Sequence, residues 1–196
     1  MIRGSEAVAE GRTSEPINRG ILLLTMNFYR DAELQGARLL LNLHHHLLDG
    51  DSQTKLTRHL ADETRHAWLW TKRIIDLGAT PISIADGYQR RLGLRIGIPK
   101  GPLDLLALTL IAETRAIERY QAHARKPGVD AATLEVLKAV SADELWHLAW
   151  IEEKMHKLAK ARGDEDHVRR TLDRYRAIER EVYASFTSDE AALMRG

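Results

Sequence analysis

The stretch DETRH at residues 62–66 and its near-copy DELWH at residues 143–147 decide how this chain folds. Each stretch places a glutamate and a histidine three residues apart, so both side chains project from one face of a helix. A lone glutamate lies 30 or 31 residues upstream of the glutamate in each copy, at Glu33 and Glu113. The chain therefore has two matching halves, each with two glutamates and one histidine.

Apolar residues recur at intervals of three and four along four long segments, as they do on the buried face of a helix. This pattern predicts helices over about residues 17–48, 51–77, 102–124 and 131–161. Short breaks fall near residues 50 and 128, whereas residues 78–101 have no sustained period and form a long connection, with room for a short helix over 85–92. We therefore expect an all-α, antiparallel four-helix bundle with a long crossover between its second and third helices.

The two ends of the chain lie outside this pattern. Residues 1–16 are polar and end at a proline, so we expect a flexible lead-in to a bundle over residues 17–162. The remaining residues, 163–196, carry an apolar stripe over 164–187 that predicts a fifth, amphipathic helix. The sequence leaves open whether that helix caps the bundle or contacts another subunit.

The upstream glutamates, Glu33 and Glu113, lie within apolar stripes rather than opposite them. A buried carboxylate without a partner is costly enough that it normally neutralises, pairs or binds a cation. Because antiparallel helices rise equally and each half is nearly symmetric about its turn, all four glutamates and both histidines reach one layer. Four carboxylates and two neutral imidazoles balance two divalent cations. The charge count therefore predicts a dinuclear metal site.

These motifs and this connectivity resemble the ferritin-like superfamily of di-iron carboxylate proteins, and the ligand pattern is nearest to bacterioferritins and rubrerythrins. The resemblance covers about residues 19–162. It implies two iron ions per chain, although histidine and carboxylate ligands also suit manganese. The implied ligands, which would also carry the catalysis, are bridging Glu63 and Glu144, terminal Glu33 and Glu113, and His66 and His147, one on each metal.

The chain departs from both of these relatives. It has no cysteine, so it cannot build the additional rubredoxin-type iron site of classical rubrerythrins. Ala116 stands three residues after Glu113, where those proteins carry another carboxylate, and this weakens a peroxidase assignment. None of the four methionines aligns with the haem ligand of bacterioferritins.

Several polar neighbours of the motifs have two interpretations. Asp62 and Asp143 precede the motif glutamates, and they would orient His147 and His66 across the pseudo-twofold axis or be ordinary surface acids. His59 is one turn before the first motif glutamate. It would be an additional ligand or a proton carrier, and a partly exposed helix histidine is the simpler interpretation.

Aromatic and histidine residues near the motifs also have two interpretations. Tyr29 and Tyr120 would hydrogen-bond ligands or relay electrons, although a core tyrosine with one satisfied hydroxyl is commoner. The run His44–His46 looks like a metal tract, but successive helical positions point apart and a helix end suits imidazolium. Trp146, inside the second motif, is placed to shape access to the metals.

The composition excludes several classes of protein. Lys and Arg number 29 against 28 Asp and Glu, so nothing suggests a partner of nucleic acid or membrane surface. The absence of cysteine excludes disulfides, zinc–thiolate sites and iron–sulfur clusters. No apolar run reaches the length of a membrane span, and the polar N-terminus does not resemble a signal peptide, so a cytoplasmic location is expected.

The favoured function is an iron-dependent oxidoreductase of ferroxidase, oxidase or oxygenase type that activates O2 or peroxide at a bridged dinuclear centre. The ligands leave open whether Fe(II), a peroxide-derived species or a small organic substrate is oxidised. Two alternatives remain: an iron-binding and storage protein, and a non-catalytic helical bundle that binds metal without turnover. By superfamily habit, we expect a homodimer or a larger homo-oligomer.

Overall fold

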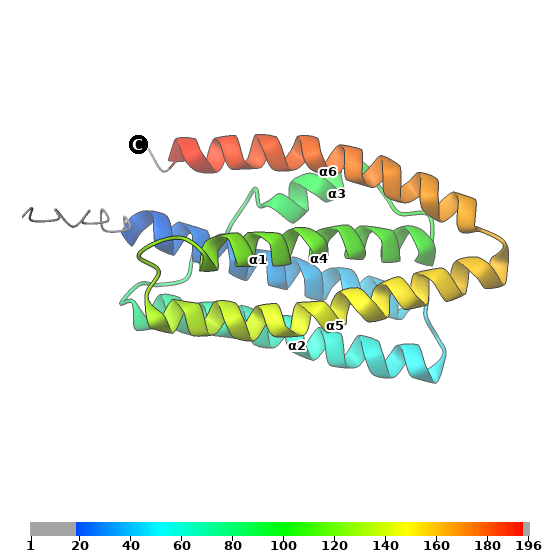
Figure 1. Ribbon diagram of the computed structural model, residues 1–196, viewed down its shortest axis with the longest axis horizontal. Helices are drawn as coiled ribbons and strands as arrows, with labels where there is room; N and C mark the ends of the chain where they lie inside the picture. Colours follow the sequence, from blue (N-terminus) through cyan, green and yellow to red (C-terminus); the bar gives the residue numbers. More distant parts are fainter. Residues whose placement is uncertain (1–18, 194–196) are drawn as a thin grey trace, which may run out of the picture.

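A computed structural model describes residues 19–193, and within them the chain forms six helices and no strand (Figure 1). The helices are α1 (Arg19–His44), α2 (Gly50–Asp76), α3 (Tyr88–Ile96), α4 (Pro102–Ala124), α5 (Ala131–Arg162) and α6 (Glu165–Leu193). The expected all-α class is confirmed. The lead-in predicted over residues 1–16 lies outside the described residues.

Four of the helices form an antiparallel bundle. The two hairpins are α1 with α2 and α4 with α5, and they pack together through α2 against α5 and α1 against α4 (Figure 1). Short turns close both hairpins, whereas residues 77–101 connect one hairpin to the other and contain α3. The expected order of short turn, long crossover and short turn is therefore confirmed.

Local side-chain chemistry sets the ends of these helices. Asp49 caps α2 by accepting a hydrogen bond from the backbone N–H of Ser52 at 3.0 Å, and Asp130 caps α5 by accepting from Thr133 at 2.9 Å. Helix α4 begins at Pro102, as expected. The sequence around this turn offers Asp51 or Ser52 as the cap of α2. That expectation is wrong, because the helix starts at Gly50 and its cap is Asp49.

The other two helices lie outside the bundle on one side. Helix α6 packs along α4, and α3 lies beside α6 and touches α1 (Figure 1). Phe28 of α1 and Phe186 of α6 meet edge to face with ring centroids 5.0 Å apart. Helix α6 therefore covers one face of the bundle within its own chain. None of the described helices is both long and apolar enough to cross a membrane.

The interior contains two apolar clusters of buried side chains. The larger cluster includes Leu40, Leu106 and Met155, and the smaller one includes Met26, Trp70 and Val140. On α2, α4 and α5, the motif glutamates lie between buried members of the two clusters, and Glu33 on α1 lies between Met26 of the smaller cluster and Leu40 of the larger. The motif side chains therefore lie in a layer that apolar packing separates from both ends of the bundle.

Candidate metal centre

All six predicted site residues lie in this one buried layer, contributed by four helices. Each exposes 5% or less of its surface, although four of them are carboxylates. The side chains are Glu33 from α1, Glu63 and His66 from α2, Glu113 from α4, and Glu144 and His147 from α5. Two matching halves thus meet in the fold as their spacing predicted.

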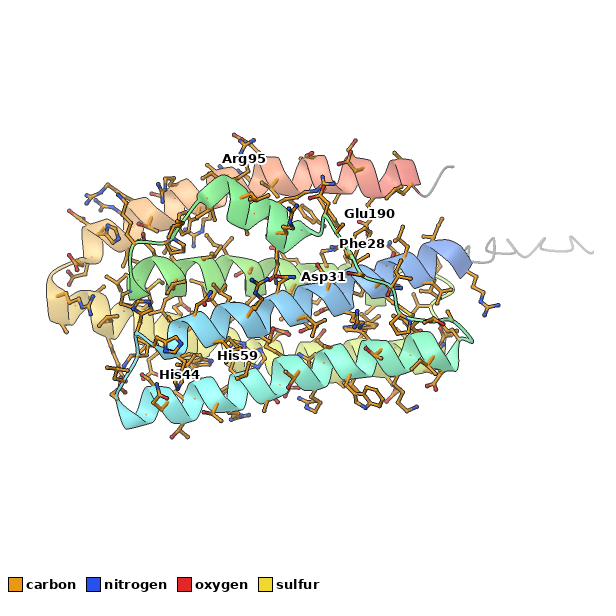
Figure 2. All side chains as sticks on the ribbon, turned by 180° about the vertical axis from the view of Figure 1, so that it is seen from behind. Phe28, Asp31, His44, His59, Arg95 and Glu190 are labelled. Carbon is orange, nitrogen blue, oxygen red and sulfur yellow. The ribbon has the colours of Figure 1, made fainter. Side chains whose placement is uncertain are left out.

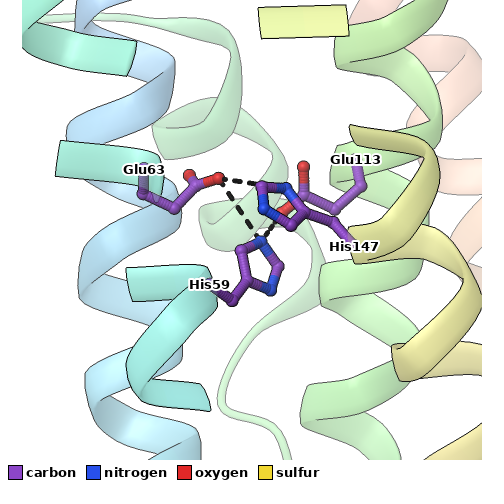
Figure 3. Close-up of side chains that lie close together, drawn as sticks. All are labelled: His59, Glu63, Glu113 and His147. Atoms are coloured by element: carbon purple, nitrogen blue, oxygen red, sulfur yellow. Dashed lines mark ion pairs between the residues drawn. The ribbon is translucent and has the colours of Figure 1, made fainter. Parts of the chain in front are cut away.

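The layer contains two groups of four residues whose N and O atoms lie within 4.8 Å of one another and could hold a metal ion. One group is Glu33, Glu63, His66 and Glu144. The other is His59, Glu63, Glu113 and His147 (Figure 3). Glu63 belongs to both groups, so the two potential metal positions are adjacent and share a carboxylate.

His59 is the seventh polar residue of this layer. Its side chain is fully buried, so the interpretation as a partly exposed helix histidine is wrong. Figure 2 shows His59 inside the bundle and His44 toward its end. His59, Glu63 and His66 follow the i, i+4, i+7 spacing of a single helix face, which is the signal that could have placed His59 in the layer.

The motif histidines are oriented by the acid that precedes the glutamate of the other motif. Nε2 of His66 lies 3.1 Å from Oδ2 of Asp143, and Nε2 of His147 lies 3.4 Å from Oδ2 of Asp62. This crossed pairing confirms one of the two interpretations of the aspartates. A carboxylate accepts the Nε2–H of each ring, which leaves both Nδ1 atoms facing the glutamates.

A single guanidinium joins the two orienting acids. Nη2 of Arg65 donates to Oδ1 of Asp62 at 2.9 Å and to Oδ2 of Asp143 at 2.7 Å. These charge-assisted bonds hold the pKa of Asp143 below its usual range against the opposing effect of burial. Sequence reasoning missed Arg65, because nothing local to the first motif indicates that its side chain reaches α5.

The four glutamates lie close together in a buried environment that disfavours their charged forms. Burial, followed by the charges of Glu113 and Glu33, raises the pKa of Glu63 well above its usual range. Burial also raises the pKa of Glu113. Burial opposes the charging of His66, yet its contacts with Glu144 and Glu33 raise the pKa of its imidazole to about 10. Without other cations, this layer retains protons.

The donor set nevertheless fits a pair of divalent cations. Three buried atoms of the six predicted ligands lack a hydrogen-bond partner: Oε1 of Glu63, Nδ1 of His66 and Oε1 of Glu144. Within residues 19–193, no lysine or arginine forms an ion pair with any of the four glutamates. Unpaired lone pairs and uncompensated negative charge are what a metal ion would satisfy.

Glycine 36 makes room for the shared carboxylate. A β-carbon at this position would overlap Oε2 of Glu63, because α1 and α2 approach closely here. A glycine inside a helical pattern often marks such an approach. The glycine one turn after Glu33 could therefore have been recognised in the sequence as a point of close approach. The sequence did not indicate that Glu63 is the residue that approaches it.

The two tyrosines differ in their relation to the site. The buried hydroxyl of Tyr120 donates a hydrogen bond to Oε1 of Glu33. The ring of Tyr29 packs against that of Tyr120 at 4.9 Å, and its hydroxyl contacts no site residue. His44, His45 and His46 are exposed at the end of α1 and belong to neither group.

Comparison with known proteins gives one informative result. No family model matches the sequence, and no curated protein matches it. Among solved structures, a dodecameric thioferritin, the bacterioferritin-related protein from Bacteroides fragilis, superposes with a TM-score of 0.52 over 73% of this chain and 91% of its own, at 20% identity. The chain thus has a ferritin-like fold, an antiparallel four-helix bundle with one long crossover and a C-terminal helix laid along it.

Proposed function

We propose that the protein is a di-iron carboxylate oxidoreductase that activates O2 or peroxide at the buried layer of four glutamates and two histidines. The observation that carries the proposal is the pair of adjacent residue groups that share Glu63 and contain unpartnered buried donor atoms. Negative charge with no lysine or arginine partner there is best explained by two bound cations.

In this proposal Glu63 and Glu144 would each contribute to holding both metal ions. The two oxygens of Glu144 support this role, because Oε1 lies 3.4 Å from Nδ1 of His66 and Oε2 lies 3.2 Å from Nδ1 of His147. One carboxylate therefore faces both imidazole donors. Glu33 and Glu113 would each hold one metal ion, and His66 and His147 would each offer Nδ1 to one of them.

The chemistry follows from the donors and their surroundings. Two iron ions would supply the electrons that reduce O2 or peroxide, and manganese suits the same donor types. The protein excludes bulk water with the apolar clusters on both sides of the layer, and it holds a proton on the Tyr120 hydroxyl beside Glu33. Fe(II) or a small organic molecule would be the species oxidised.

The test combines metal stoichiometry with O2 uptake. Anaerobic titration with Fe(II) should saturate near two irons per chain, and admission of air should then consume O2. Glu63→Ala and Glu144→Ala should abolish binding of the metal pair while the bundle stays helical by circular dichroism. Glu152→Ala, an exposed glutamate of the same helix as Glu144, is the matched control. Two irons per chain in both site variants would contradict the assignment.

Iron storage is the alternative function, and the dodecameric neighbour is the observation that favours it. Under this alternative the chain assembles as a homo-oligomer, and iron oxidation serves only to load the mineral. Light scattering would then give a mass many times that of one chain, and iron would accumulate far beyond two per chain. A saturated, metal-loaded protein that consumes no O2 would instead indicate a passive metal-binding bundle.

A further inference from the structure

His59 occupies a position in the layer that the six proposed ligands do not explain. Its Nε2 lies 3.2 Å from Oε1 of Glu113 and 3.4 Å from Oε1 of Glu63 (Figure 3). Its ring stacks on that of His147 with centroids 3.6 Å apart and an interplanar angle of 23°. By distance alone, His59 would be a third nitrogen ligand.

The opposite edge of the same ring argues against coordination. The indole Nε1 of Trp150, one turn after His147, lies 3.1 Å from Nδ1 of His59. An indole N–H is only a donor, so Nδ1 of His59 must accept and carries no proton. The proton of the neutral ring is then on Nε2, the atom that faces the two glutamates. An Nε2–H group has no lone pair for a metal.

We infer that Trp150 holds His59 with its Nε2–H directed at the Glu113 and Glu63 carboxylates and thereby prevents it from being a third histidine ligand. His59 is a positioning residue in this assignment, and it acts on the metals only through the two glutamates. The effect of His59 on metal binding rests on the proposed dinuclear site. The position of the proton on His59 does not depend on any metal.

The other terminal glutamate has a corresponding arrangement. Glu33 accepts a hydrogen bond through Oε1 from the neutral hydroxyl of Tyr120, and its Oε2 lies 3.4 Å from Nδ1 of His66. Glu113 likewise presents Oε1 to the Nε2–H of His59. Each terminal carboxylate thus has a neutral donor beside one oxygen, which leaves the other oxygen for a metal.

Coordination by His59 would carry two costs. The ring would have to lose its Nε2 proton and become an imidazolate, or move its proton to Nδ1 and break the bond to Trp150. The second route leaves two N–H groups facing each other in a fully buried site, since the His59 side chain has no exposed surface. Both costs favour two nitrogen ligands rather than three.

The test is a long-range proton–nitrogen correlation spectrum of the full-length protein labelled with 15N-histidine, recorded metal-free and with Zn(II). We expect His59 to show an unprotonated Nδ1 and a protonated Nε2 in both states. A Zn(II)-bound Nε2, or a protonated Nδ1, would overturn the inference. The signals are assigned from the spectrum of His59→Gln.

Trp150→Phe and Trp146→Phe form a matched pair, because Trp146 also lies beside His59, with ring centroids 6.3 Å apart, but donates no bond to it. Trp150→Phe should shift His59 to a mixture of proton positions, and Trp146→Phe should leave it unchanged. An unchanged tautomer in Trp150→Phe would overturn the role of the indole.

Affinity measurements test the positioning role separately. His59→Leu should weaken one of two Zn(II) sites by roughly 10- to 100-fold, the usual effect of losing an outer partner of a ligand, and His59→Gln should recover part of it. The exposed His156→Leu is the control. Unchanged Zn(II) affinity in His59→Leu would contradict this role. If the His66 and His147 signals do not change on addition of Zn(II), the dinuclear site itself is refuted. The metal-free spectrum still tests the position of the proton on His59.

Discussion

The carboxylate of Glu63 on α2 occupies the space that a side chain at Gly36 on α1 would fill. The shared carboxylate of the two residue groups therefore depends on a residue that offers no ligand atom. A substitution at Gly36 can therefore disturb the site without destabilising the helix, because alanine is a better helix former than glycine.

Gly36→Ala should displace the Glu63 carboxylate and weaken metal binding by at least roughly 10-fold, the lower end for loss of an outer support. Helicity should persist, since alanine favours the helix by about 1 kcal/mol over glycine. Calorimetric titration with Zn(II) and thermal denaturation measure the two effects. Gly93→Ala is the control, because a β-carbon there meets no atom within 4 Å. Equal Zn(II) affinity in both variants would contradict the steric argument.

Tyr120→Phe should weaken metal binding without a loss of secondary structure. The variant removes the only donor to Oε1 of Glu33 among the described residues, so that carboxylate loses its orientation. Tyr29→Phe is the matched control, because its hydroxyl contacts no site residue. Fe(II) binding isotherms for the two variants should differ, with the loss confined to Tyr120→Phe. A loss of equal size in Tyr29→Phe would point to general packing of the tyrosine pair instead.

Asp143→Asn should lower metal affinity by roughly 10- to 100-fold, as expected when a ligand histidine loses its carboxylate partner. The amide is nearly isosteric, but it is a weaker acceptor for the Nε2–H of His66 and no longer pairs with Arg65. Asp173→Asn, an exposed aspartate on α6, provides the control. Competition with a chromophoric chelator measures both affinities. Full affinity in Asp143→Asn would show that the acid does not orient the histidine.

Acid should destabilise the protein partly through His123, which is buried in α4 away from the polar layer. Burial, followed by the positive charges of Lys126 and Arg119, lowers the pKa of His123 to about 4. The unfolded chain binds this proton near pH 6.5, so the folded state loses stability as pH falls from about 6.5 to 4. The loss should be on the order of 1–3 kcal/mol at pH 4, once solvent screening is allowed for.

His123→Leu should reduce this part of the acid sensitivity. Nδ1 of His123 has no hydrogen-bond partner, so an apolar replacement sacrifices no such bond at that atom. Urea unfolding of both proteins at pH 7 and pH 4.5 provides the comparison, and the glutamate layer contributes equally to each. The wild-type protein should lose more stability between the two pH values. An identical loss in the variant would show that His123 is protonated in the folded state.

Much of the site follows from local spacing. Glu144 and His147 share a helix face because they are three residues apart, and any stable helix brings them together. The depth of Glu33 relative to Glu63 follows equally from the turn between them, because antiparallel helices rise at the same rate. These relationships need only helical geometry, so the six-residue layer was predictable.

Other features depend on residues that are distant in the chain. The proton on His59 depends on Trp150, 91 residues later, and the orientation of His66 depends on Asp143. The sequence placed the start of α2 one residue late, at residue 51 instead of Gly50. Asp49, Asp51 and Ser52 lie within four positions, and all three are residue types that cap helices. The backbone conformation of the turn decides which of these three residues caps the helix.

By itself, the sequence determined the helical class, the two-hairpin order and the residues that face one another in the buried layer, because periodicity and turn position act over one or two elements. The tertiary structure decided which face α6 covers, how Arg65 joins Asp62 to Asp143, and which atom of His59 carries its proton. The last two features depend on single hydrogen bonds between helices, whose direction is set only when both helices are packed in place. The face that α6 covers depends on apolar contacts between distant segments, such as that of Phe28 with Phe186.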